Sequence, residues 1–180
     1  MTEALLASMS QFDIEVELAG RTWVVPAAPA AAWFEAVLSS GACPVVPGML
    51  TPEDEEDMVD LILDGAIAAA ELERANHDAL GVASGWNWWE AERLIVSIAH
   101  DWKVVGGVLL QHGIRLADEP LGAVLAATYA LATANMNRED RFAFEAALTA
   151  PPLGHAEEWF EGIGFADQFQ ALIAAARTGG

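Results

Sequence analysis

The sequence predicts a mainly α-helical protein with a small N-terminal β-hairpin and a bundle-like helical body. Strict alternation of apolar and acidic residues over 12–18 indicates a strand with one buried face. Apolar residues recur at spacings of three and four over 88–109, and residues 120–134 are almost wholly apolar. Both patterns are typical of helices that pack in a core. We expect an N-terminal segment with the hairpin at 1–27 and a helical body at 28–180, together forming one cooperative domain.

The predicted hairpin consists of two short strands and a tight turn. Its first strand alternates four apolar with three acidic residues: Phe12, Ile14, Val16 and Leu18 against Asp13, Glu15 and Glu17. Ala19-Gly20 supplies the turn, residues 21–25 return as the second strand, and Pro26 ends the pairing because it lacks an N–H donor. An isolated hairpin is only marginally stable in water, so we expect this one to lie on the helical body.

Capping signals place the helices. Thr51 precedes Pro52 and acidic residues, and Asn137 precedes a similar acidic turn; both patterns are typical of helix N-termini. Gly65 is expected to break or kink the first of these helices. The expected helices are 30–38, 52–64, 66–80, one continuous helix over 88–109, 120–134, one from 137 to before Pro151, and 167–177, with a loop at 43–48 and a linker at 81–85.

Charge and composition favour a protein that binds other proteins. The 180 residues carry a formal net charge of −19, yet 54% of them are hydrophobic. Chains this acidic are disordered when they have little apolar surface to bury, which is not the case here. We expect a dense anionic shell over a large core, which would repel nucleic acid and anionic membranes. We therefore expect no nucleic acid and no membrane among the partners.

Residue types with catalytic or metal-binding chemistry are sparse. The single cysteine, Cys43, allows no intrachain disulfide and fits a reducing cytosol. The four histidines form no HExxH or ExxH pair; we interpret His77 as a surface partner of Glu73, and His100 as a polar edge of the helix over 88–109. The acids at 53–57 are explained by a solvated helix start. We expect no catalytic, cofactor-binding or metal-binding residues, and no enzyme.

Tryptophans are the candidate binding residues. Trp86, Trp88 and Trp89 form a WNWW cluster at the start of the predicted helix over 88–109, and Trp102 lies further along it. Successive helical residues point about 100° apart, so Trp88 and Trp89 cannot fully share one face. All of them could be core residues. Alternatively, part of the cluster could anchor a protein partner, because tryptophan is enriched at binding hot spots.

The order of several segments resembles the tail assembly chaperones of long-tailed phages that infect actinobacteria. The similarity covers roughly residues 12–154. It runs through FDIEVELAGRTWVVPA, AAAWFEAVLSSG, VVPGML, SGWNWWEAERLI, W-x-x-VGG-x-LL (residues 102–110), PLGAVLAATYAL and NREDRFAFEAALTAPPLG.

This resemblance implies a non-enzymatic protein of the host cytoplasm that binds the tape measure protein. Such chaperones keep the long, helical, aggregation-prone tape measure protein soluble while the tail tube assembles around it. The major tail protein is a possible further partner, and a homo-oligomer is possible. Other interpretations stay open: an acidic inhibitor or DNA mimic, a virion tail completion protein, and an enzyme with an unrecognised site.

Overall fold

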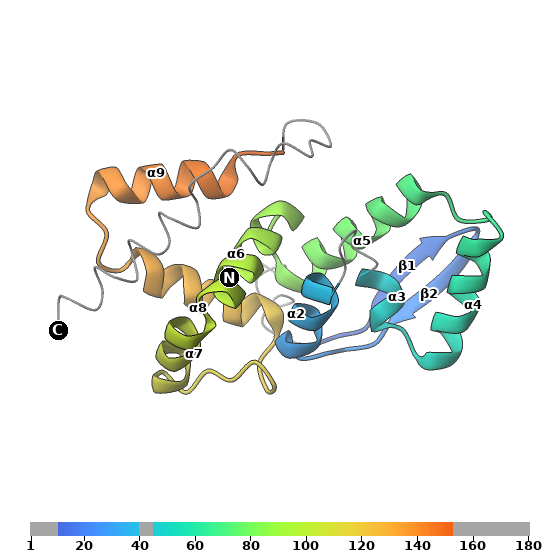
Figure 1. Ribbon diagram of the computed structural model, residues 1–180, viewed down its shortest axis with the longest axis horizontal. Helices are drawn as coiled ribbons and strands as arrows, with labels where there is room; N and C mark the ends of the chain where they lie inside the picture. The colour runs from blue at the N-terminus through green and yellow to red at the C-terminus, as the bar shows by residue number, and fades with distance from the viewer. Residues whose placement is uncertain (1–10, 40–44, 153–180) are drawn as a thin grey trace.

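The computed structural model describes residues 11–39 and 45–152, and the predicted fold class is confirmed in them. A two-stranded hairpin is followed by helices that make up most of the described chain (Figure 1). The elements are β1 (Ile14–Leu18), β2 (Arg21–Val25), α2 (Ala30–Ser39), α3 (Val45–Met49), α4 (Pro52–Leu63), α5 (Ala69–Ser84), α6 (Trp88–His100), α7 (Trp102–Gln111), α8 (Leu121–Thr133) and α9 (Arg138–Thr149).

The hairpin forms as the alternation predicts. β1 and β2 pair antiparallel with Ile14 opposite Val25 and Leu18 opposite Arg21. Alternate side chains of β1 are buried, and β1 packs against α5, so the expected support by the helical body is confirmed. The turn places both Ala19 and Gly20 at positive φ, 52° and 71°. This turn conformation matches the right-handed twist of the two strands.

The turn conformation makes Ala19 a site for stabilisation. A residue with a Cβ in the left-handed region is strained, and asparagine tolerates this region better than alanine does. Replacement Ala19→Asn is therefore expected to raise the free energy of unfolding by about 0.5–1 kcal/mol. Urea denaturation measures this change. Ala27→Asn is a control, because Ala27 is also exposed but not at positive φ; a gain as large in the control would contradict the turn argument.

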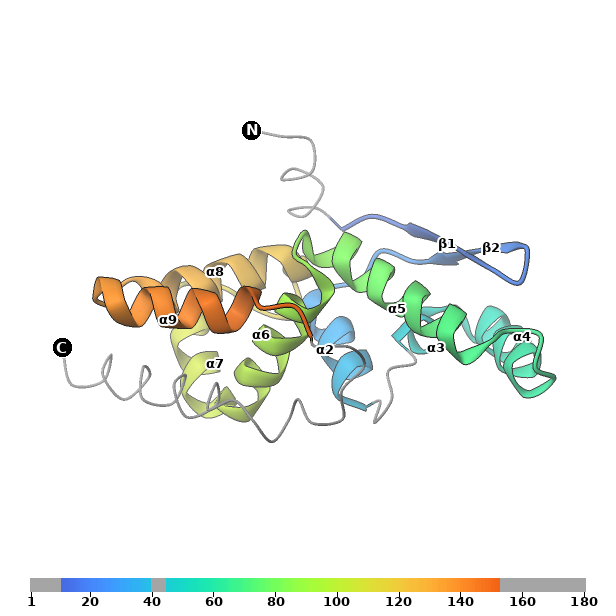
Figure 2. The same ribbon diagram turned by 90° about the horizontal axis from the view of Figure 1, so that it is seen from above.

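The elements are arranged along one long axis. The hairpin, α3 and α4 lie at one end, α6 to α9 lie at the other, and α2 and α5 lie between them (Figures 1 and 2). Helix α5 contacts β1 and α3, and also α6 and α8. One cluster of buried apolar side chains extends through all of these elements. The N-terminus of α2 is held by the loop between α7 and α8, where the carbonyls of Leu116 and Glu119 accept from the N–H groups of Ala31 and Ala30.

Most helix boundaries follow the predicted caps. Thr51 Oγ1 accepts from the N–H of Asp54 and Asn137 Oδ1 accepts from that of Asp140, which confirms both N-caps. Gly65, at φ 72°, follows α4 as expected. Two expectations were wrong. Residues 45–48 of the expected loop belong to α3, and the expected linker 81–85 mostly belongs to α5, which ends at Ser84. The helix expected at 167–177 lies outside the described residues.

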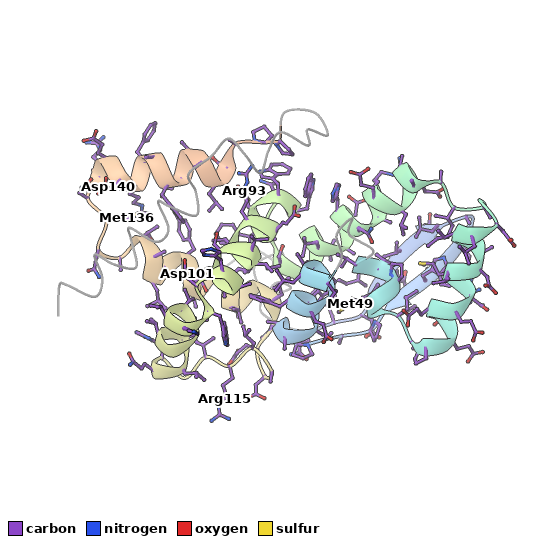
Figure 3. The ribbon with its side chains drawn as sticks, viewed as in Figure 1. Met49, Arg93, Asp101, Arg115, Met136 and Asp140 are labelled. Atoms are coloured by element: carbon purple, nitrogen blue, oxygen red, sulfur yellow. The ribbon has the colours of Figure 1, made fainter. Side chains whose placement is uncertain are left out.

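The single helix expected over 88–109 is also wrong, because the chain bends by 99° between α6 and α7. Asp101 forms the corner (Figure 3): its N–H closes α6 on the carbonyl of Ser97, and its carbonyl accepts from Val105 in α7. The bend turns Val105 and Leu109 inward, and α7 packs against α8. Periodicity alone missed the corner because both helices keep the same apolar spacing.

The apolar repeat over 88–109 was expected to pack in the core, and this is confirmed for the part of the repeat that lies in α6. Helix α6 contacts α5, α8 and α9, and Ile95 and Ile98 are fully buried. Within the described ranges, no single helix is long and apolar enough to cross a membrane. Helices α6 and α7 are long and apolar enough only when they are counted together as one segment, and that segment is bent between them.

Candidate functional site

The WNWW segment lies where α5 passes into α6. Gly85, at φ 70°, ends α5 in a left-handed conformation. Ser84 is buried, and its Oγ accepts from the N–H of Trp86 at 3.2 Å. Asn87 is the N-cap of α6, and its N–H donates to the Glu90 carboxylate at 3.1 Å. This reciprocal cap fixes the direction in which the three tryptophans leave the backbone.

The three tryptophans of the WNWW segment are half-buried, and each meets a different partner. The ring of Trp86 lies 5.5 Å from that of Tyr129 in α8, between centroids. Trp88 stacks on His77 in α5 with centroids 3.5 Å apart, and its edge meets Trp89 at 5.7 Å. Trp89 Nε1 donates to the carbonyl of Thr149 at the end of α9, at 3.3 Å. We call these rings, with Phe144 of α9, which lies 6.0 Å from Tyr129, the aromatic junction.

Trp102 is separate from the aromatic junction. It begins α7, beyond the bend, and 43% of its surface is exposed. Its ring covers Gly106 one turn later, so closely that a Cβ at Gly106 would lie 2.9 Å from a ring carbon. The structure therefore brings three of the four candidate tryptophans together and leaves the fourth on another surface.

A buried arginine lies beside the aromatic junction. Arg93 of α6 points to the C-terminal end of α9 (Figure 3), where its Nη1 donates to the carbonyls of Ala147, at 2.7 Å, and Leu148. Its Nη2 donates to the carbonyl of Ala150. These carbonyls belong to the last turn of α9 and its C-cap, where a helix has no N–H groups left to offer. The positive charge also complements the negative end of the helix dipole.

Burial changes the acid–base properties of this region. Desolvation lowers the pKa of Arg93 to about 10, while the charges of Glu90 and Glu92 raise it in part. Arg93 is therefore charged at neutral pH. Desolvation raises the pKa of Glu92 above its usual range, and the charge of Arg93 lowers it in part. Burying the charge of Arg93 away from water costs free energy, and the hydrogen bonds from Arg93 to α9 offset this cost.

A group of hydrogen-bonded side chains centred on Glu145 also joins α8 to α9. Tyr129 donates from its hydroxyl to Glu145 Oε1 at 2.6 Å, and Arg141 Nε donates to the same oxygen at 2.8 Å. These two hydrogen bonds, that from Tyr129 first, lower the pKa of Glu145. Desolvation, and then the bond to Glu145, raise the pKa of Tyr129.

Sequence reasoning missed several of these partners. It interpreted His77 as a surface partner of Glu73 and did not indicate that its ring stacks on Trp88. It did not single out Arg93 or Tyr129, although the only arginine of the segment now seen as α6 and the only tyrosine of the chain were visible signals. The other described histidines lie elsewhere: His100 is 3.6 Å from Asp101, and His112 contacts the carbonyl of Val108. His155 lies outside the described residues.

The described part of the chain contains no group of three or more His, Cys, Asp or Glu side chains placed to hold a metal ion. The acids at 53–57 lie at the start of α4, where Arg21 forms ion pairs with Asp54, at 3.2 Å, and Asp57, at 2.8 Å. Such exposed pairs contribute little to stability.

Comparison with known proteins gives no relative. No protein-family model, no curated protein and no solved structure matches this chain.

Proposed function

We propose that this protein is a phage tail assembly chaperone that binds the tape measure protein and keeps it soluble while the tail tube forms. The observation that carries the proposal is the order of the segments over residues 12–154, which resembles that family along most of the chain. In this proposal the protein acts in the host cytoplasm, without a cofactor and without catalysis. The major tail protein is a possible second partner.

The surface chemistry supports this role. Large apolar side chains are exposed on α7 and α9, where Trp102, Leu110 and Phe142 are 43%, 58% and 75% exposed. The chain that carries these side chains has a net charge of −19. Repulsion between such negatively charged molecules keeps their complexes dispersed. Single exposed apolar side chains are common, but helices that display them suit helix-on-helix binding to a long helical client.

We propose the four tryptophans as the client-binding residues, with different roles. Trp102 is the exposed one and offers its ring directly to a client helix. Trp86, Trp88 and Trp89 are half-buried, so they offer an edge while they also hold α5, α6, α8 and α9 together. Apolar contacts of this kind should depend only weakly on salt, in contrast to binding through surface charges.

Co-expression with a tape measure protein tests the proposed function. Wild-type chain should raise the soluble fraction of the tape measure protein and co-elute with it in size-exclusion chromatography. Replacement Trp102→Ala should weaken the complex by about 2 kcal/mol, or about thirtyfold in Kd, if the ring is a hot spot. Trp102 is the first choice because its exposure leaves the fold least affected.

Leu63→Ala is the matched control. Leu63 is 78% exposed on α4, at the end of the molecule away from α7, and its replacement should leave both solubility and binding unchanged. Absence of rescue and of a complex with the wild-type chain would contradict the proposed function. Rescue that survives alanine at each of the four tryptophans would contradict their role in binding.

A further inference from the structure

Helix α9 is attached to the body of the protein through a narrow contact. Of its 12 residues only Phe144 and Leu148, one turn apart, are buried, whereas α6 buries seven of 13. Figures 1 and 2 show α9 on the outside of the molecule, beside α8 and at the end opposite the hairpin. The loop before it is short, and Pro151 and Pro152 follow it.

The surface beneath α9 is built to receive a helix. Phe144 lies against Tyr129 of α8, whose ring also meets Trp86 just before α6, and both Phe144 and Leu148 belong to the buried apolar cluster. Arg93 and Trp89 then close the C-terminal end of α9 with donors to four carbonyls. Two apolar anchors one turn apart, lying on a hydrophobic surface, define helix-in-groove recognition.

The hydrogen bonds from Arg93 and Trp89 do not depend on the sequence of the bound helix. They go to main-chain carbonyls of α9, in the groups described above. Every helix exposes such carbonyls in its last turn. The contacts described above that involve side chains of α9 are those of the two anchors and the hydrogen bond from Tyr129 to Glu145. Another helix with two apolar side chains one turn apart, close to its C-terminal end, would fit the same surface.

We propose that α9 is a displaceable occupant of a helix-binding surface on α6 and α8, and that an amphipathic helix of the client takes its place. The client helix carries two apolar residues four apart in its last two turns, and its terminal carbonyls accept from Arg93 and Trp89. In the absence of client, α9 covers Tyr129 and Trp89 and protects them from self-association. The identity of the client rests on the proposed function; the displaceability of α9 does not.

Hydrogen exchange of the full wild-type chain tests whether α9 opens by itself. Amides of a separately opening segment exchange faster than those that need global unfolding. We expect the amides of Phe144 to Thr149 to be protected at least tenfold less than those of Leu94, Ile95 and Ile98 in α6. The difference should persist at low denaturant concentration. Equal protection of α9 and α6 would overturn the proposal.

A peptide with the sequence of residues 137–152 tests whether the surface accepts a helix in trans. In the full-length double variant Phe144→Ala, Leu148→Ala the chain's own α9 loses its anchors, so the peptide should bind. In the wild type the attached α9 competes at an effective concentration of about millimolar, so binding should be at least tenfold weaker. Isothermal titration measures both.

The control peptide carries the same two alanine replacements and should not bind either protein. Circular dichroism and the exchange of α6 amides check that the double variant is folded; if it is not, the wild-type exchange experiment decides alone. Equal binding to wild type and variant, or no binding to a folded variant, would overturn the proposal. Peptide binding without rescue of the tape measure protein would refute the proposed function and leave the helix-binding surface standing.

Discussion

Replacement Ile98→Ala is expected to lower the free energy of unfolding by about 3 kcal/mol. Ile98 is fully buried in α6, and this helix packs against α5, α8 and α9. Truncating a buried isoleucine removes its transfer free energy and leaves a cavity, which together typically cost about 2–5 kcal/mol. Because α6 is surrounded by other helices on several sides, these helices can move little to fill the cavity that the replacement leaves. Urea denaturation followed by circular dichroism measures the loss.

Leu63→Ala is the control for this experiment. It deletes a side chain of similar size from another helix, but Leu63 is 78% exposed, so the change should stay within about 0.5 kcal/mol. A loss in Ile98→Ala no larger than in this control would mean that the apolar repeat in α6 is not part of the core.

Local sequence signals correctly predicted the features that depend on residues close together in the chain. The alternation over 12–18, the Ala19-Gly20 turn and the caps at Thr51 and Asn137 each depend on neighbouring residues, and the structure has all of them. The apolar repeat also identified the buried face of α6. These features follow from period and capping chemistry, which a single sequence displays.

Features that depend on contacts between residues far apart in the chain could not be predicted from the sequence. The corner at Asp101 leaves the apolar spacing intact, so the repeat predicted one helix where packing against α8 requires two. Partners of the tryptophans lie up to 60 residues away, as for Trp89 and the carbonyl of Thr149. The spacing within WNWW did not show that Trp88 and Trp89 meet edge to face at 5.7 Å, and it could not name His77 as a stacking partner.

The place of Arg93 explains how a charged side chain can be buried in α6. A buried charge is costly unless it is hydrogen-bonded, and Arg93 finds its acceptors in the main chain of a helix more than 50 residues away. Sequence alone shows the charge and not the acceptors. The same arginine connects the stability of α9 to the proposed client-binding surface.

Replacement Arg93→Ala is expected to release α9. Loss of the bonds to the carbonyls of Ala147, Leu148 and Ala150 should lower the free energy of opening of α9 by about 2–4 kcal/mol, because hydrogen bonds to charged groups contribute about 1.5–3 kcal/mol each and removal of the buried charge recovers part of the loss. Hydrogen exchange should show this as at least a thirtyfold loss of protection in α9.

Two further variants separate this effect from a general loss of charge. Arg93→Lys keeps the charge, but a single ammonium cannot reproduce the planar fork of the guanidinium, so α9 should be released almost as much. Arg115→Ala removes an exposed arginine side chain that projects from the loop between α7 and α8, and should leave α9 protected (Figure 3). Amides of α6 at Leu94 and Ile95 should lose far less protection than those of α9 in Arg93→Ala. Equal losses in the two helices would mean that α9 unfolds only with the whole protein and that Arg93 stabilises the fold as a unit.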